Sequence, residues 1–170
     1  MPGSDYRFDA TAAAVVRVMF RGRKPLVLDV GAGAGKGATV FGPPLSREVH
    51  GLEIFRKYID EFDLRTKYAE VFCGNIMDWS PCQLSKYDLL VAGDVLEHLT
   101  IDDARKLIRN CQLSGCSMIV QVPFLYEQGP ENGNEYERHI QPDLTRDLMA
   151  VRYPMLFEVL ADPRLGLYIL

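Results

Sequence analysis

The chain has 170 residues, the size of one domain, and we expect a single domain over residues 1–170. Hydrophobic residues make up 48% and charged residues 25%, which excludes a disordered or collagen-like chain. The net charge of −4 lacks the basic excess that tight, non-specific nucleic-acid binding requires.

Cysteine spacing and the N-terminal residues indicate the compartment. The sequence has Cys73, Cys82, Cys111 and Cys116, with no Cys-x-x-Cys pair that would indicate a zinc ribbon or a redox motif. We interpret them as reduced thiols. The apolar run over residues 10–20 is too short to span a bilayer, so we expect a cytoplasmic protein with no membrane partner.

Helical and strand patterns alternate along the chain. In chain order they predict a helix over residues 10–20 capped by Asp9, a strand over 26–30, a helix over 36–41, a strand over 49–54, a helix over 55–62, strands over 68–73 and 87–93, a helix from 101 capped by Thr100, a strand over 117–122, a helix over 142–152 with Pro142 in its first turn, and strands over 155–160 and 165–170. About four residues separate the last two strands, which therefore form an antiparallel hairpin. The order predicts an α/β fold: a doubly wound, seven-stranded sheet, mostly parallel with a C-terminal antiparallel hairpin strand and helices on both faces.

Residues 125–141 interrupt this alternation. They include Gly129, Pro130 and the run Asn132-Gly133-Asn134, and they are too long for an ordinary connection. Long loops of compact domains often cover binding sites, so we expect a substrate lid.

A glycine-rich turn follows the first predicted strand. A strand, such a turn and a helix N-terminus form a nucleotide-type site. A P-loop is excluded because Val30 and Gly37 stand where its first glycine and its hydroxyl belong. A dinucleotide motif starting at Gly31 has Lys36 at its sixth position, which fails. One starting at Gly33 matches formally at Gly33, Gly35 and Ala38, but the loop then starts two residues late. Asp29 would also repel a pyrophosphate, whereas it tolerates a cationic ligand.

The run from Asp29 to Gly35, DVGAGAG, resembles the first motif of the class I S-adenosylmethionine-dependent methyltransferases. Glu53 follows at the distance of the acid that accepts the ribose hydroxyls in that family, residues 73–76 resemble the adenine motif, and residues 87–99 resemble the fourth motif. The resemblance implies S-adenosylmethionine as cofactor. The cofactor-binding residues it implies are Asp29, Gly31, Ala32, Gly33, Gly35, Glu53, Ile54, Asn75, Ile76, Gly93 and Asp94.

Each polar member of this set has a simpler interpretation. Asp29 could only orient the glycine turn by hydrogen bonds to backbone amides. Glu53 could be a solvated strand end. Asn75 could be only a turn residue, and the family often has aspartate there.

The acceptor leaves fewer marks in the sequence. Asp94-Val95-Leu96-Glu97 lacks the Asn/Asp-Pro-Pro run of amino-directed DNA methyltransferases, and Pro81-Cys82 precedes the strand after which a cytosine-directed nucleophile belongs. The run DVLEHL resembles the version in many methyltransferases that act on small molecules. We therefore expect a small-molecule acceptor with a reacting O or N atom. A nucleic acid is disfavoured, and a partner protein that brings the acceptor stays open.

His139 and His98 are the expected catalytic residues. Histidine suits proton removal near neutral pH, and His139 lies in the predicted lid. We expect no metal site, but one alternative stays open: Asp94, Glu97, His98 and His139 could hold a divalent ion, since their spacing resembles metal-assisted RNA 2′-O-methyltransferases. A non-catalytic scaffold and an NAD-dependent oxidoreductase are the remaining alternatives.

Overall fold

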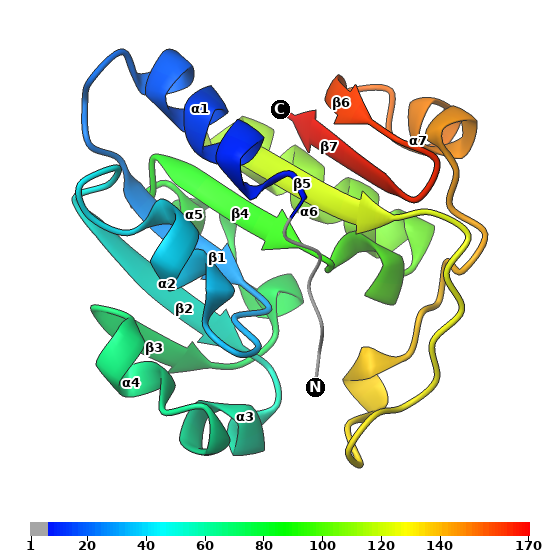
Figure 1. Ribbon diagram of the computed structural model, residues 1–170, viewed down its shortest axis with the longest axis horizontal. Helices are drawn as coiled ribbons and strands as arrows, with labels where there is room; N and C mark the ends of the chain where they lie inside the picture. Colours follow the sequence, from blue (N-terminus) through cyan, green and yellow to red (C-terminus); the bar gives the residue numbers. More distant parts are fainter. Residues whose placement is uncertain (1–6) are drawn as a thin grey trace.

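A seven-stranded sheet forms the centre of the computed structural model, which describes residues 7–170 (Figure 1). The strand order is β3-β2-β1-β4-β5-β7-β6. The strands are β1 (Leu26–Val30), β2 (Glu48–Glu53), β3 (Glu70–Cys73), β4 (Leu89–Gly93), β5 (Ser117–Pro123), β6 (Phe157–Ala161) and β7 (Leu165–Ile169). Only β7 runs antiparallel to its neighbours, β5 and β6. The predicted fold class is confirmed.

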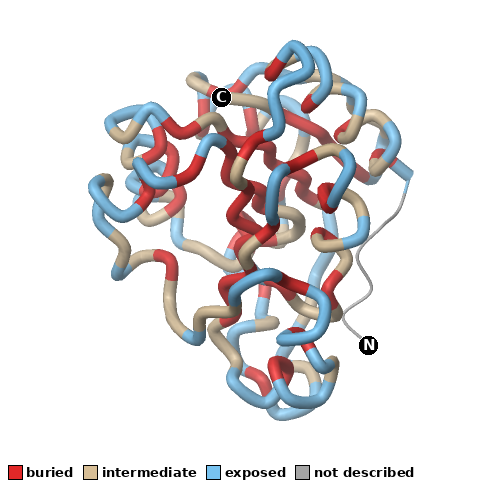
Figure 2. Tube along the Cα trace, turned by 90° about the vertical axis from the view of Figure 1, so that its left-hand side faces the viewer, coloured by how far each residue is buried: buried red, intermediate tan, exposed pale blue. Residues whose placement is uncertain are grey.

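Helices cover both faces of the sheet (Figure 1). They are α1 (Asp9–Phe20), α2 (Lys36–Phe41), α3 (Arg56–Glu61), α4 (Leu64–Lys67), α5 (Pro81–Leu84), α6 (Ile101–Ser114) and α7 (Arg146–Arg152). Successive strand side chains point to opposite faces, so Val27 of β1 packs with α1 to α4, and Leu28 packs with α5 to α7. Figure 2 shows these buried strands enclosed by exposed turns.

Helix α6 illustrates how local sequence sets an element. The Thr100 hydroxyl accepts a hydrogen bond from the Asp103 backbone N–H, as the predicted cap requires. Gly115 ends the helix in the left-handed conformation that glycine adopts without strain. The buried residues of the helix follow a helical period: Ala104, Leu107, Ile108 and Cys111.

Two predicted helix starts are wrong. Asp9 is the first residue of α1 rather than its cap, and its carboxylate pairs with Lys36 at 2.8 Å. Pro142 lies outside α7, which begins at Arg146 because the Thr145 hydroxyl caps the Leu148 backbone N–H. A side chain that can accept a hydrogen bond fixes the start of α7 more strongly than the φ preference of a proline.

The parallel strands end at a common edge of the sheet, and the chain between β5 and α7 extends past that edge (Figure 1, yellow to orange). Short 3₁₀ turns lie at the same edge: η1 (Ile76–Asp78), η2 (Leu96–His98) and η3 (Glu135–Glu137). Within residues 7–170, no helix has the length and apolar character needed to cross a membrane.

Candidate functional site

A cavity of about 1250 Å³ opens at the carboxyl ends of the parallel strands. Ten of the expected cofactor-binding residues line it: Asp29, Gly31, Ala32, Gly33, Glu53, Ile54, Asn75, Ile76, Gly93 and Asp94. Gly35 is the exception, because it caps α2 behind the turn. Ligand pockets commonly measure about 300–1,000 Å³, so the cavity has room for a cofactor and a second molecule.

Hydrogen bonds to β2 hold the glycine turn open toward this cavity. The backbone N–H groups of Gly31 and Ala32 donate to the Leu52 carbonyl at 2.9 and 3.2 Å. Gly33 has a φ of 49° and donates its N–H to Glu53 Oε2 at 2.9 Å. The turn therefore leaves its inner face without side chains beyond a methyl group, where a ligand can approach the backbone closely.

Glu53 is held rigidly inside the cavity. Its exposed fraction is 4%, so it is not a solvated strand end. The second oxygen, Oε1, accepts the Phe55 N–H at 2.8 Å. Burial raises the pKa of Glu53, and the backbone hydrogen bonds oppose that rise. A carboxylate oxygen accepts up to two hydrogen bonds, so each oxygen keeps a lone pair that fits one hydroxyl of a ribose diol.

Asp29 is buried in the wall of the cavity, beside the first turn of α2. Its Oδ2 accepts a hydrogen bond from the Tyr68 hydroxyl, and no backbone amide of residues 7–170 donates to it, in contrast to the alternative interpretation. Burial raises the pKa of Asp29 to about 7, while the Tyr68 hydrogen bond lowers it and Glu53 raises it further. A Cβ at Gly37 would overlap the Asp29 carboxylate, so the first turn of α2 packs directly on it.

Replacing Asp29 with asparagine should flatten the pH dependence of stability. The pKa of Asp29 is raised from 3.8 to about 7. Its contribution to the free energy of unfolding is therefore fully present below pH 4 and is lost as the pH rises through 7. The shift corresponds to at most about 4 kcal/mol. Thermal unfolding of both proteins between pH 4 and 8 measures their difference in stability. The variant should become more stable relative to wild type as the pH rises. Parallel curves would contradict the assignment.

Asn75 and Asp94 lie at neighbouring strand ends. Asn75 Oδ1 accepts the Met77 N–H at 2.9 Å and so caps η1, as the turn interpretation holds, yet the residue also lines the cavity. Asp94 has a φ of 56°, which is uncommon outside glycine, and its N–H donates to the Gln121 carbonyl at 2.9 Å. Residues kept in such conformations cluster at functional sites.

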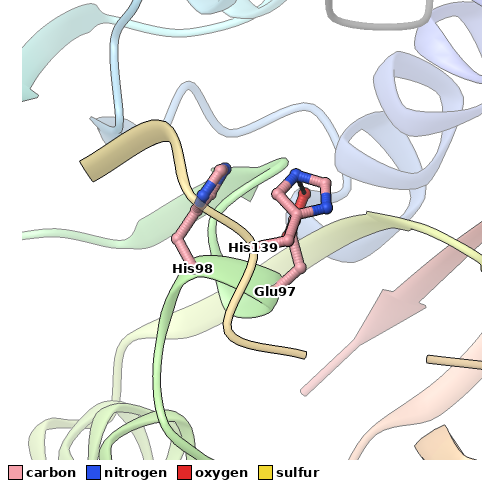
Figure 3. A group of neighbouring side chains, drawn as sticks. All are labelled: Glu97, His98 and His139. Atoms are coloured by element: carbon pink, nitrogen blue, oxygen red, sulfur yellow. Dashed lines mark ion pairs between the residues drawn. The ribbon is translucent and has the colours of Figure 1, made fainter. Parts of the chain in front are cut away.

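Glu97, His98 and His139 converge at the far end of the cavity (Figure 3). Their carboxylate and imidazole donor atoms all lie within 4.8 Å of one another. Asp94 is not part of this group, although its charge helps to raise the pKa of Glu97, mainly raised by burial. Glu97 Oε1 lies 4.0 Å from His139 Nε2. The structure thus unites both expected catalytic residues with Glu97.

Backbone carbonyls orient both imidazoles. His98 Nδ1 lies 3.1 Å from the Arg138 carbonyl, and His139 Nδ1 lies 2.7 Å from the Tyr126 carbonyl. A carbonyl only accepts, so Nδ1 carries the proton in each ring. Burial lowers the pKa of His98 to about 4 and also lowers that of His139. Both rings are therefore neutral at pH 7, with an unprotonated Nε2.

Gln141 fastens the segment that carries His139, and no sequence pattern pointed to it. It is 4% exposed, and its Nε2 donates to the carbonyls of Leu96 and Leu99, both at 2.9 Å. The Glu97 carbonyl also accepts the N–H groups of Ile140 and Gln141. These bonds fix the end of the segment to η2, the turn that carries Glu97 and His98.

Solved structures of methyltransferases share this fold. The methyltransferase domain of bacterial CtHen1-CN matches with a TM-score of 0.66 and 16% identity, covering 99% of this chain and 100% of that one. The 1,6-didemethyltoxoflavin-N1-methyltransferase of Burkholderia thailandensis, solved with 1,6-didemethyltoxoflavin and S-adenosylhomocysteine, matches with a TM-score of 0.63 and 15% identity, covering 97% and 78%. N-methyltransferase NodS of Bradyrhizobium japonicum WM9 matches with a TM-score of 0.60 and 16% identity, covering 97% and 96%.

Sequence comparison gives the family itself. No curated protein sequence matches the chain. The family described as Methyltransferase domain matches residues 27–113, more than half of the chain and the part that runs from β1 into α6. Together with the sheet order and the glycine turn, this match shows that the chain belongs to the class I S-adenosylmethionine-dependent methyltransferases.

Proposed function

We propose that residues 1–170 form one methyltransferase domain whose cavity holds S-adenosylmethionine against the glycine turn, Glu53, Asn75 and the end of β4. The cavity lined by ten of the eleven expected residues carries this proposal. Glu53 would bind the ribose hydroxyls, Asn75 and Ile76 the adenine edge, and Gly93 and Asp94 the methionine end. Asp29, in the cavity wall, and Gly35, which does not line the cavity, would support the glycine turn.

The acceptor that fits best is a small molecule without a large negative charge. Beyond the proposed cofactor half, the cavity is bordered by Glu127, Glu131, Glu135 and Glu137, against Arg138. Their charge would repel a phosphate backbone, which disfavours nucleic acid. Residues 125–141 would act as the substrate lid. The Burkholderia thailandensis enzyme binds a small acceptor in the same fold. A cytoplasmic location would suit the thiols.

His98 and His139 are the proposed catalytic residues. S-adenosylmethionine supplies an electrophilic methyl group, and an O or N acceptor that takes it must lose a proton. Both Nε2 atoms lie unprotonated beside Glu97, close in sequence to the end of β4. The acceptor's reacting atom would lie against these imidazoles, which promote the loss of its proton.

A screen with radiolabelled S-adenosylmethionine tests this function. We expect methyl transfer to some members of a panel of small hydroxyl and amine compounds, and none to RNA or DNA oligonucleotides. In His139→Asn, turnover should fall by roughly 100-fold or more, with cofactor binding retained. His50→Asn is the matched control, because His50 lies on β2, contacts the Tyr87 hydroxyl and does not line the cavity. Transfer to oligonucleotides alone would overturn the small acceptor.

A further inference from the structure

The Glu97 carboxyl group is buried without a hydrogen-bond partner among residues 7–170. Its exposed fraction is 1%, and neither oxygen accepts a hydrogen bond from another residue. Buried polar side chains are normally hydrogen-bonded, and buried carboxylates are normally paired or coordinate a metal ion. The imidazoles of His98 and His139 lie beside the Glu97 carboxyl group, with ligand atoms within 4.8 Å. His139 Nε2 is 4.0 Å from Glu97 Oε1, too far for a hydrogen bond, and His98 makes none to the carboxyl group, so neither ring satisfies it.

The two imidazoles are arranged as metal ligands usually are. In metal sites, the nitrogen that does not bind the ion typically donates to a carbonyl or carboxylate, which fixes the ring and its tautomer. His98 and His139 both donate Nδ1–H to backbone carbonyls. The rings come from different elements, η2 and the segment fastened by Gln141, yet their centroids are only 4.6 Å apart at a near-perpendicular angle. Three groups that can each donate a lone pair to a metal ion therefore converge within 4.8 Å.

We propose that Glu97, His98 and His139 bind one divalent transition-metal ion, contrary to the expectation from the sequence. Two imidazoles and a carboxylate suit zinc, cobalt or iron better than magnesium or calcium, which prefer oxygen ligands. A bound ion would hold these donors about 3–3.5 Å apart. From the 4.8 Å span, the donor atoms therefore need to close by at most about 1.3–1.8 Å.

Such an ion narrows the acceptor class, a step that rests on the proposed function. Three protein ligands leave coordination positions open, and the group lines the cavity. An amine bound to the ion would lose the lone pair it needs for attack, whereas an oxygen keeps further lone pairs. The acceptor is then a hydroxyl compound. Its O–H proton leaves to water, its oxygen forms the new O–CH₃ bond as the S–CH₃ bond breaks, and that electron pair stays on sulfur.

Metal binding can be measured without turnover. Tag-free, full-length protein stripped with chelator is titrated with CoCl₂ and with ZnCl₂, by calorimetry and by visible absorption of the cobalt. We expect one equivalent to bind, with a cobalt spectrum that zinc abolishes. In Glu97→Gln and in His139→Asn the affinity should fall by about 10–100-fold or more. His50→Asn, which removes the one remaining histidine of the three in the chain, should leave the metal affinity unchanged.

The outcomes separate this proposal from the proposed function. S-adenosylmethionine binding in every variant, measured in the same calorimeter, confirms that the cavity is folded. Absence of stoichiometric cobalt and zinc binding would overturn the metal site while the methyl-transfer screen still tests the enzyme. Equal metal affinity in wild type, Glu97→Gln and His139→Asn would overturn it as well. Turnover with amines alone would overturn the hydroxyl acceptor.

Discussion

Replacing Glu53 with alanine is expected to weaken S-adenosylmethionine binding by roughly 100-fold, measured by calorimetry. Hydrogen bonds to a charged group contribute about 1.5–3 kcal/mol, so losing the two proposed bonds to the ribose costs about 3 kcal/mol or more. The variant also leaves the Gly33 and Phe55 N–H groups without their acceptor, which loosens the glycine turn. Both effects act in the same direction.

Two further variants separate binding from structure. Glu53→Gln keeps an oxygen that can accept one of the backbone N–H groups, but it cannot accept from both hydroxyls of a diol, so its affinity should lie between those of wild type and alanine. Glu48→Ala removes the same side chain from the other end of β2, where it is exposed and outside the cavity. Its affinity should equal wild type. Wild-type affinity in Glu53→Ala would refute the proposed role of this residue.

Much of the fold follows from local patterns. The apolar runs of β1 and β4 and the capped stripe of α6 are readable because each depends on neighbours within a few residues. The cofactor half of the cavity is equally readable. Its residues stand directly after parallel strands, and such strands end at one edge. We can therefore predict, without knowing the connections between the strands, that four residues meet there: Asp29, Glu53, Asn75 and Gly93.

Contacts between residues that are separated by long connections cannot be predicted from local sequence patterns. His139 is separated from Glu97 by α6, β5 and a segment with little regular structure, and the hydrogen bonds of Ile140 and Gln141 tie that segment back to η2. The sequence identified both histidines as chemically suitable. It could not show that their tautomers are fixed by the carbonyls of Arg138 and Tyr126, because backbone carbonyls leave no trace in side-chain patterns.

The partner of Asp29 is a similar case. Its position after the apolar part of β1 suggested a ligand or the backbone amides of the turn. Instead, the hydroxyl of Tyr68, 39 residues later in the α4–β3 connection, donates the hydrogen bond to Asp29. The carboxylate therefore fills space beneath α2, and this packing explains a glycine whose role the motif comparison did not show.

Gly37→Ala is expected to destabilise the protein by about 3 kcal/mol, in the upper range for overpacked cores. For a chain of this size that lowers the unfolding temperature by about 6–12 °C. Helix propensity predicts the opposite sign, since alanine is favoured over glycine in a helix by about 1 kcal/mol. Gly37 is buried in α2, however, and all three atoms of the Asp29 carboxyl group lie where the methyl group would go. Tyr68 holds that group from the other side, so it cannot retreat.

A double-mutant cycle with Asp29→Ala tests this cause. Removing the carboxylate frees the space beneath α2, so adding Gly37→Ala to Asp29→Ala should cost little or even stabilise the helix. Both proteins that carry Asp29→Ala lack the Tyr68 hydrogen bond, so its loss cancels when they are compared. An equal cost of Gly37→Ala in both backgrounds, measured by denaturant unfolding, would rule out the overlap. The expected coupling would instead show that glycine follows Lys36 because the acid at the end of β1 occupies the volume of its side chain.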